Sequence, residues 1–279
     1  MKFLFFLFPF FCCCTFAQTN SDKALVESFF NLSMKNSIDS EILRAALIFL
    51  DTPYVGGTLE QSKEEELIVN LHEVDCMTLV EYCLAMSRAV QLSSPDWESF
   101  KTELRKIRYR NGLINGYVSR LHYATDWIHD NVGKGIFEDV THALGGRKYI
   151  VNVHFMSENP EKYKHLANDT VAVQQIAQIE KEINARSNYF YIPKKEIATH
   201  QSLIKSGDII CFTTSIAGLD VSHLSIAYWN KNQLTFIHAS STAKKVIINP
   251  ESLVEYCNAV RSCTGIMVLR AVNVVAKGE

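Results

Sequence analysis

The sequence has little of three things that mark common protein classes. It has eight cysteines, three of them adjacent at positions 12–14, and no CxxC pair of the kind that holds structural zinc. It has no excess of basic residues, which argues against a nucleic-acid partner. After residue 17 no run approaches the ~18 apolar residues of a membrane span. We therefore expect no metal, no cofactor and no stable membrane insertion.

Residues 1–17 have the pattern of a cleaved signal peptide. Lys2 precedes an apolar run over 3–11, and Thr15 and Ala17 place small residues three positions and one position before the cut. The expected protein is exported, either periplasmic or secreted. The cysteines at 12–14 leave lipidation as an alternative, which the bulky residues at 8–11 disfavour. Because Lys2 leaves with the signal, 27 basic and 30 acidic residues give the mature chain a formal charge of −3.

The cysteines of the mature chain are scattered and odd in number. They are Cys76, Cys83, Cys211, Cys257 and Cys263. Their sparse spacing does not resemble a disulfide framework, although the sequence does not decide whether any of the last three form a disulfide. An odd number in an exported protein leaves at least one thiol free. That thiol is a candidate nucleophile.

The order of the expected elements predicts an α+β fold with one domain over residues 18–279. Apolar residues recur at helical spacing over 21–50 and 77–90, and Asp75 is a candidate N-cap of the second stretch. Residues 96–190 are mostly polar at helical spacing and are predicted to be a helical elaboration of the same domain. An antiparallel sheet of about five strands is expected to follow, over 208–212, 223–229, 233–238, 245–248 and 265–272.

Cys76 is expected in the first turn of its helix, where unpaired backbone N–H groups and the helix dipole favour a thiolate. Cys83 falls seven residues later on the same apolar stripe and is interpreted as core. A thiol nucleophile needs a base within hydrogen-bonding reach, and the base needs an orienting partner.

His223 and His238 are the best candidates for base and orienting residue. A tight turn at Asn230-Lys231 would place the two histidines directly opposite each other on neighbouring strands, with Cβ atoms about 4.5–5.5 Å apart. A turn one residue later, at Lys231-Asn232, would make them diagonal neighbours on the same face. A loop of odd length would separate them.

Four segments together resemble the NlpC/p60 superfamily of cell-wall cysteine peptidases. They are residues 52–57 (TPYVGG), 74–80 (VDCMTLV), 222–226 (SHLSI) and 237–240 (IHAS). The resemblance implies a papain-like fold in which the nucleophile helix packs on the sheet. It implies Cys76 as nucleophile, His223 as base, His238 as orienting residue and Tyr54 beside the cysteine.

Further segments resemble the N-acetylmuramoyl-L-alanine amidase-like branch, known as domain of unknown function 1460. They are residues 54–60, 108–110, 119–123, 125–127 and 218–223. This branch implies hydrolysis of the amide between N-acetylmuramic acid and L-alanine through a thioester. A γ-D-glutamyl endopeptidase and a thioester-forming acyltransferase are the alternatives, because the Cys/His chemistry is shared. A monomer acting on peptidoglycan or muropeptides is expected.

The residue types near the signature also suggest where substrate binds. Arg120, His122 and Tyr123 combine a cation, an imidazole and an aromatic face in one short segment, which suits a carboxylate and a sugar. Asp75 could bind a substrate amine, although a helix N-cap already has a structural task.

Overall fold

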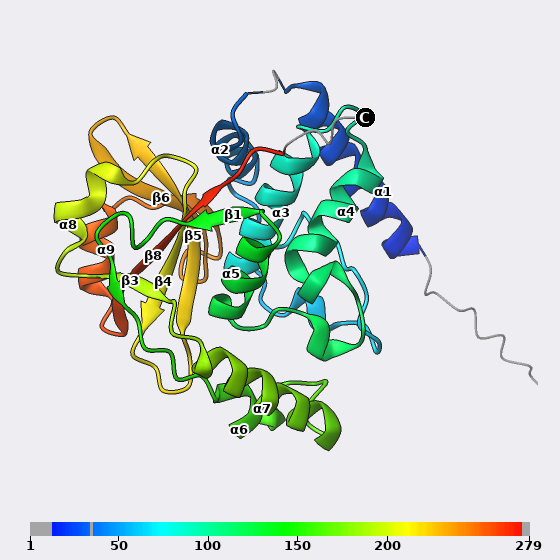
Figure 1. Cartoon of the computed structure of the whole chain (residues 1–279). Helices are drawn as coiled ribbons and strands as arrows, with labels where there is room; N and C mark the ends of the chain where they lie inside the picture. Colours follow the sequence, from blue (N-terminus) through cyan, green and yellow to red (C-terminus); the bar gives the residue numbers. More distant parts are fainter. Residues whose placement is uncertain (1–12, 34–35, 275–279) are drawn as a thin grey trace, which may run out of the picture.

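The computed structural model describes residues 13–33 and 36–274 of the chain (Figure 1). Most of the predicted signal peptide, residues 1–12, lies outside the described residues, and the first described helix is α1, Cys13–Asn31. Within the described part, no helix is long and apolar enough to cross a membrane.

Most of the helices precede most of the sheet in the chain, an order that fits an α+β fold. The helices after α1 are α2 Ile38–Ile48, α3 Cys76–Ala89, α4 Trp97–Arg108, α5 Ala124–Gly133, α6 Phe155–Glu158, α7 Thr170–Ala185, α8 Ile197–His200 and α9 Leu253–Ala259. The strands are β1 Phe137–Asp139, β2 Arg147–Lys148, β3 Phe190–Pro193, β4 Ile209–Thr214, β5 Val221–Asn230, β6 Gln233–Ser240, β7 Lys245–Ile248 and β8 Cys263–Ala271.

The sheet is antiparallel and has eight strands in the described residues, not about five. Its order is β2-β3-β8-β4-β5-β6-β7, and β1 also pairs with β8. All five expected strands are present as β4 to β8. The three additional strands are two to four residues long, too short for a period-2 pattern to identify. Two of them interrupt the 96–190 segment, so that segment is not wholly helical.

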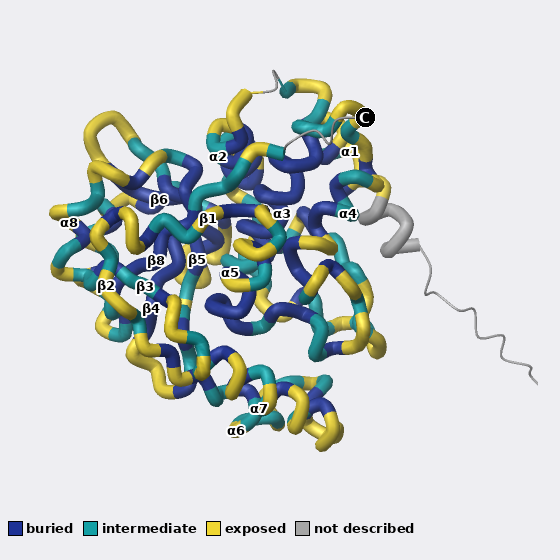
Figure 2. Tube along the Cα trace, viewed as in Figure 1, coloured by how far each residue is buried: buried dark blue, intermediate teal, exposed yellow. Residues whose placement is uncertain are grey.

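The sheet separates two layers of helices (Figure 1). Helices α2 and α3 pack against one face, and α9 packs against the other. Buried residues follow the central strands and α3, as the dark trace in Figure 2 shows, and they form two clusters. Leu224 and Ile226 of β5 belong to the cluster on the α3 side, whereas Phe212 and Ala227 belong to the cluster on the α9 side.

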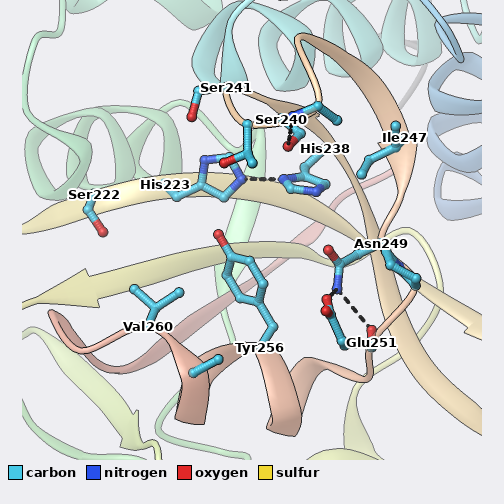
Figure 3. A pocket seen from close by; sticks show the side chains of 14 residues that line it. Ser222, His223, His238, Ser240, Ser241, Ile247, Asn249, Glu251, Tyr256 and Val260 are labelled. Carbon is cyan, nitrogen blue, oxygen red and sulfur yellow. Dashed lines mark hydrogen bonds between the residues drawn. The ribbon is translucent and has the colours of Figure 1, made fainter.

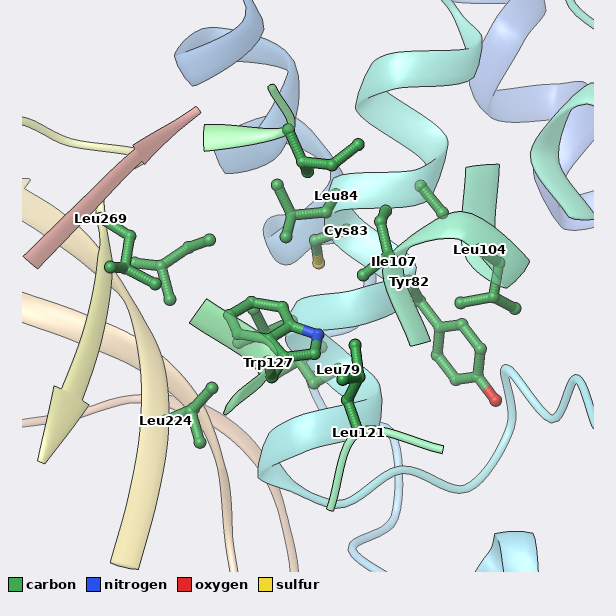
Figure 4. Packing of buried hydrophobic residues seen from close by; sticks show 14 of the residues in the cluster. Leu79, Tyr82, Cys83, Leu84, Leu104, Ile107, Leu121, Trp127, Leu224 and Leu269 are labelled. Carbon is green, nitrogen blue, oxygen red and sulfur yellow. The ribbon is translucent and has the colours of Figure 1, made fainter. Parts of the chain in front are cut away.

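Helix α3 is the central helix of its layer. Asp75 caps it, accepting hydrogen bonds from the backbone N–H of Met77 at 3.0 Å and of Thr78 at 2.8 Å, and Thr78 completes a capping box. Cys83 is fully buried among Leu79, Leu84 and their neighbours, which confirms its interpretation as core (Figure 4).

Two ion pairs tie α3 to α4. Arg108 and Glu81 are both buried and join at 2.6 Å, and Arg108 also donates to the carbonyl of Ile68 at 2.6 Å. Arg88 and Glu103 join at 2.8 Å. Because a buried charge without its partner is strongly destabilising, these pairs fix the position of α3 and of its first residue, Cys76.

The turn between β5 and β6 lies one residue later than the first of the two predicted turns, which shifts the cross-strand pairing by two residues. Asn230 pairs with Gln233, so Lys231 and Asn232 form the turn, and Lys231 has a positive φ of 55°. Continuing this register would place His238 opposite Ser225, not opposite His223. The two histidines are therefore diagonal neighbours, which was the second of the two turns considered, and they keep the same face.

Candidate functional site

Cys76 is the first residue of α3 and lies against β5. Of the five cysteines that follow residue 17, all of them free, Cys76 is half-buried and the other four are buried. The backbone N–H of Leu224 is close enough to the sulfur to lower the pKa of the thiol, so the thiol lies next to the strand residue that follows His223. A cavity of about 210 Å³ opens beside it, with a largely apolar wall that includes Met77, Leu219 and Leu224.

The electrostatic setting of Cys76 differs from the prediction. The backbone N–H groups of the helix start do lower the pKa of the thiol, as expected, but burial and the Asp75 charge outweigh them and raise it to about 12. The resting group is therefore a neutral thiol near pH 7. Desolvation depends on which residues pack around the sulfur, and the position of Cys76 at the start of a helix does not reveal those residues.

The two histidines meet on the α9 face of the sheet (Figure 3). His223 Nε2 lies 2.8 Å from His238 Nδ1, and the rings are nearly perpendicular with centroids 4.9 Å apart. The remaining nitrogen of His223, Nδ1, has no hydrogen bond within the described residues and is not sealed from the cavity. An imidazole held through one nitrogen with the other open has the geometry of an oriented base.

Both rings are neutral at physiological pH. Burial, with His238 as a second cause, lowers the pKa of His223 to about 3, and burial lowers that of His238 to about 4. The pair Cys76 and His223 is therefore thiol and imidazole at rest, not thiolate and imidazolium.

Cys76 approaches the histidines at the edge of β5. The pairing of β5 with β6 ends at Ile226 and Ile237 although both strands continue, so the β6-facing edge of β5 is unpaired beyond that point. The Leu224 N–H places Cys76 at this edge. Tyr256 of α9 contacts the His223 ring at a centroid distance of 6.5 Å, and burial first of all raises the pKa of that tyrosine to about 12, with Cys76 among the nearby groups that add to the shift.

No hydrogen bond joins Cys76 to His223 in the part of the chain that the structure describes. They line two adjacent cavities that share Ser222, that of Cys76 and a larger one of about 530 Å³ around the histidines. Contacts between catalytic groups are often long before substrate binds, so the roles of Cys76, His223 and His238 stay predictions.

Tyr54 is held beside Cys76 by the backbone. Val55 N–H donates to the carbonyl of Val74 at 3.0 Å, and Val74 N–H donates to the carbonyl of Pro53 at 3.0 Å. These two bonds fix Tyr54 next to the residue that precedes Asp75. Burial, and the nearby Cys76 and Asp75, raise the pKa of the Tyr54 hydroxyl, which keeps it a donor at neutral pH.

The residues predicted to bind substrate differ in how free they are. Arg120 is buried and pairs with Glu60 at 2.6 Å and Glu65 at 3.3 Å. The Tyr123 hydroxyl donates to Glu180 at 2.7 Å and accepts from the Met156 N–H at 2.9 Å.

His122 and Asp75 complete that set. Asp75 uses its carboxylate as the α3 cap. His122 lines the Cys76 cavity and bonds the Tyr117 carbonyl through Nε2 at 2.9 Å, which leaves Nδ1 to face a ligand. Of the four predicted residues, His122 is the one whose polar group the fold leaves open.

Sequence reasoning missed the wall opposite the histidines. Tyr256, on a seven-residue helix, contacts both imidazole rings, and Ser240, Ser241 and Thr242 line the same cavity. A sequence signal existed only for the helix, because Ser252 and Glu255 form a capping box. That signal does not tell which face of the sheet the helix covers.

Acid should destabilise the protein through these histidines. In the unfolded chain the rings titrate near a pKa of about 6.5. In the folded chain the pKa values of His223 and His238 are about 3 and about 4. Between these values the unfolded chain binds protons that the folded chain does not, so lowering the pH favours unfolding. We expect the Tm of the parent to fall more between pH 7 and pH 5 than that of His238→Asn, measured by circular dichroism. Equal falls would contradict the neutral, buried state of His238.

Comparisons with known proteins agree with this geometry. The model of the AmiA-like family, described as N-acetylmuramoyl-L-alanine amidase-like, matches residues 44–266. A crystal structure of an N-acetylmuramoyl-L-alanine amidase from Bacteroides uniformis is 40% identical, with a TM-score of 0.81 over 85% of this chain and 100% of that chain. No curated protein matches the chain.

Two further crystal structures are similar. A Bacteroides fragilis protein with the provisional name xylanase is 44% identical, with a TM-score of 0.78 over 82% of this chain and 99% of that chain. A Legionella pneumophila protein assigned to DUF1460 shares the fold at 21% identity, with a TM-score of 0.72 over 92% of this chain and 96% of that chain. The matched span 44–266 includes Tyr54, Cys76, His223 and His238, and the chain belongs to the N-acetylmuramoyl-L-alanine amidase-like family.

Proposed function

We propose that this chain is an exported cysteine amidase of the NlpC/p60 type that hydrolyses the N-acetylmuramoyl–L-alanine bond of peptidoglycan fragments. The observation that carries the proposal is the 2.8 Å contact of His223 with His238, on the strand against which the Cys76 thiol lies. Family membership supports the choice of bond.

The resting protonation states define the first step. Because the thiol and the imidazole are both neutral, His223 Nδ1 takes the Cys76 proton as the sulfur attacks the amide carbonyl. His223 then gives this proton to the leaving amine of L-alanine, and a thioester remains. Water, deprotonated by the same nitrogen, hydrolyses the thioester and restores the thiol.

Two donors can stabilise the oxyanion. The N–H groups of Met77 and Thr78 are occupied by the Asp75 cap. The Cys76 N–H is directed at the sulfur itself and the Tyr54 hydroxyl has no acceptor within the described residues, so both lie where an oxyanion formed beside the sulfur would be. The helix start and the tyrosine therefore supply one donor each.

Tyr54→Phe should lower kcat by about 100-fold or more, the usual cost of one oxyanion donor. KM should change little, since the hydroxyl acts on charge that develops after binding. Steady-state kinetics on a muropeptide test this, with Tyr228→Phe as a control on a partly exposed tyrosine of β5. Equal kcat in Tyr54→Phe and parent would remove Tyr54 from the oxyanion site.

The shape of the site suits the proposed bond. The scissile amide joins a lactyl group and an alanine, each with one methyl group, and the apolar side chains beside Cys76 offer contacts for them. The adjoining cavity presents hydroxyl groups from Ser240, Ser241 and Thr242, which suit the polar remainder of a muropeptide.

Glycoside hydrolysis fits the site less well. It generally needs two carboxyl groups flanking the bond, and the described cavity beside Cys76 is lined by one, Asp220. Asp220 accepts from the N–H and hydroxyl of Thr125 at 2.6 and 2.7 Å and from the Val221 N–H at 2.7 Å. Asp75 is committed to the α3 cap.

Purified mature protein incubated with defined muropeptides tests the proposal. Mass spectrometry should detect a peptide-free sugar together with a free peptide that begins with L-alanine. Cleavage after D-glutamate would show an endopeptidase instead, and a transfer product formed with an added amine would show an acyltransferase. Release of xylose oligomers from xylan would support glycosidase activity.

A further inference from the structure

The second nitrogen of His238 is a buried polar atom without a partner. Nδ1 of this ring meets His223, but Nε2 has no hydrogen bond within the described residues although it is sealed from solvent. His238 itself is 3% exposed. A buried donor or acceptor left unpaired is costly, so the surroundings of this atom should contain a group that satisfies it in the working enzyme.

Asn249 is the side chain placed to do so. It follows β7, is buried, and is fixed by its backbone, because its N–H donates to the Phe236 carbonyl at 2.8 Å and its carbonyl accepts from the Thr235 hydroxyl at 2.7 Å. Phe236 lies two residues before His238 on the same face of β6. Asn249 is therefore tied to the strand that carries His238.

Glu251 determines which way the Asn249 carboxamide points. Asn249 Nδ2 lies 3.0 Å from the Glu251 carbonyl and 3.1 Å from its carboxylate Oε2. Both partners only accept hydrogen bonds, so the NH₂ end must face them. Figure 3 shows the carboxamide oxygen turned away from Glu251, on the side of His238. The Asn249 side chain also raises the pKa of His238 against the larger lowering by burial, as an acceptor at the ring does.

We propose that Asn249 is a positioning residue that sets the tautomers of both histidines, an inference that rests on the proposed function. Asn249 Oδ1 accepts the proton of His238 Nε2, so His238 Nδ1 carries a lone pair. His223 Nε2 must then donate across the 2.8 Å contact, and His223 Nδ1 keeps the lone pair that receives the Cys76 proton.

The opposite tautomers show why this matters. Both rings are neutral near pH 7, so the contact between them does not by itself decide which ring donates. If His238 Nδ1 carried the proton, His223 Nε2 would accept and His223 Nδ1 would be protonated. A protonated Nδ1 cannot take the thiol proton. An acceptor at His238 Nε2 removes this inactive arrangement.

Asn249→Leu removes the acceptor at similar volume and tests the proposal. We expect kcat to fall about 10- to 100-fold, part of the about 100- to 10,000-fold that general base catalysis contributes, with KM little changed. Nitrogen-15 NMR of the histidine rings should show His223 protonated at Nε2 alone in the parent and a tautomer mixture in Asn249→Leu. Asn249→Asp, which keeps an acceptor oxygen, should retain the parent tautomer and more of the activity.

Two control variants separate positioning from general loosening. Ser252→Ala removes the cap of α9 just beyond this segment and should lower the Tm without changing the tautomers. Ser225→Ala removes a buried hydroxyl of β5 that, like His238 Nε2, has no partner within the described residues, and it should leave the tautomers unchanged.

Three results would overturn the inference. The first is an Asn249→Leu protein with parental tautomers, whatever its kcat. The second is a tautomer change in Ser225→Ala, and the third is Asn249→Asp no better than Asn249→Leu in both readouts. The NMR measurement needs no turnover. If the parent hydrolysed no muropeptide, the proposed function would be refuted, but the NMR measurement would still show whether Asn249 sets the tautomers.

Discussion

Cys76→Ala is expected to abolish hydrolysis, with a fall in kcat on the order of 10⁴-fold or more, because no other group can form the thioester. The fold should survive. Cys76 is half-buried, and the α3 cap uses Asp75 and Thr78, not the thiol. Turnover is measured by mass spectrometry of the released peptide, and integrity by the Tm.

Cys83→Ala is the matched control, one buried thiol two helical turns further along the same helix. It removes a sulfur from the packed cluster of Figure 4 and should cost about 1 kcal/mol of the free energy of unfolding while leaving kcat close to the parent. Near-normal turnover in Cys76→Ala, or loss of turnover in Cys83→Ala at a temperature where it is folded, would overturn the assignment.

The neutral thiol adds a chemical signature to this prediction. Because burial raises the pKa of Cys76 to about 12, the free enzyme should not show the rapid alkylation of a resting thiolate, and its activation should depend on His223. This differs from the expectation drawn from helix position alone. The effect of the helix dipole on the Cys76 pKa can be predicted from the position of Cys76 in its helix. The effect of desolvation cannot, because it arises from the packing of β5 and Leu224 against the sulfur.

The elements that carry the candidate site could be predicted from sequence because their signals are local. Asp75 and the apolar stripe after it define α3, and the five strands β4 to β8 alternate or run apolar between turn residues. The segment 137–148 gave no such signal, since β1 and β2 are two to three residues long and exist through their pairing with β8 and β3.

The register of the histidines shows the limit of local reasoning. One residue in the turn decides whether His238 faces His223 or Ser225, and the positive φ of Lys231 that shifts the turn has no glycine to signal it. The prediction that the two histidines share one face was safer than the prediction of which residues pair, because both two-residue turns keep the histidines on one face. Tyr256 and Asn249 reach the rings from α9 and from the end of β7, contacts that only the tertiary structure specifies.

Replacement of His223 should be nearly as damaging as loss of the thiol, since it removes the proton carrier for both steps. We expect His223→Asn to lower kcat by on the order of 10⁴-fold. Loss of His238 should cost less, because His238 holds the His223 ring through one hydrogen bond and does not touch the reacting atoms. His238→Ala should therefore lower kcat more than it raises KM.

Conservative replacements at position 238 sharpen this prediction. The atom of His238 that meets His223 is Nδ1, and the carboxamide of asparagine branches at the same distance from the backbone, so His238→Asn can present Oδ1 to the His223 Nε2–H. His238→Gln places its polar atoms one bond further out, near the position of Nε2. The expected order of kcat is parent, His238→Asn, His238→Gln, His238→Ala and then His223→Asn, measured on one muropeptide at one pH. A His238→Ala enzyme as fast as the parent would remove His238 from the site, and with it the tautomer chain through Asn249, leaving Cys76 and His223 as a dyad in need of another orienting residue.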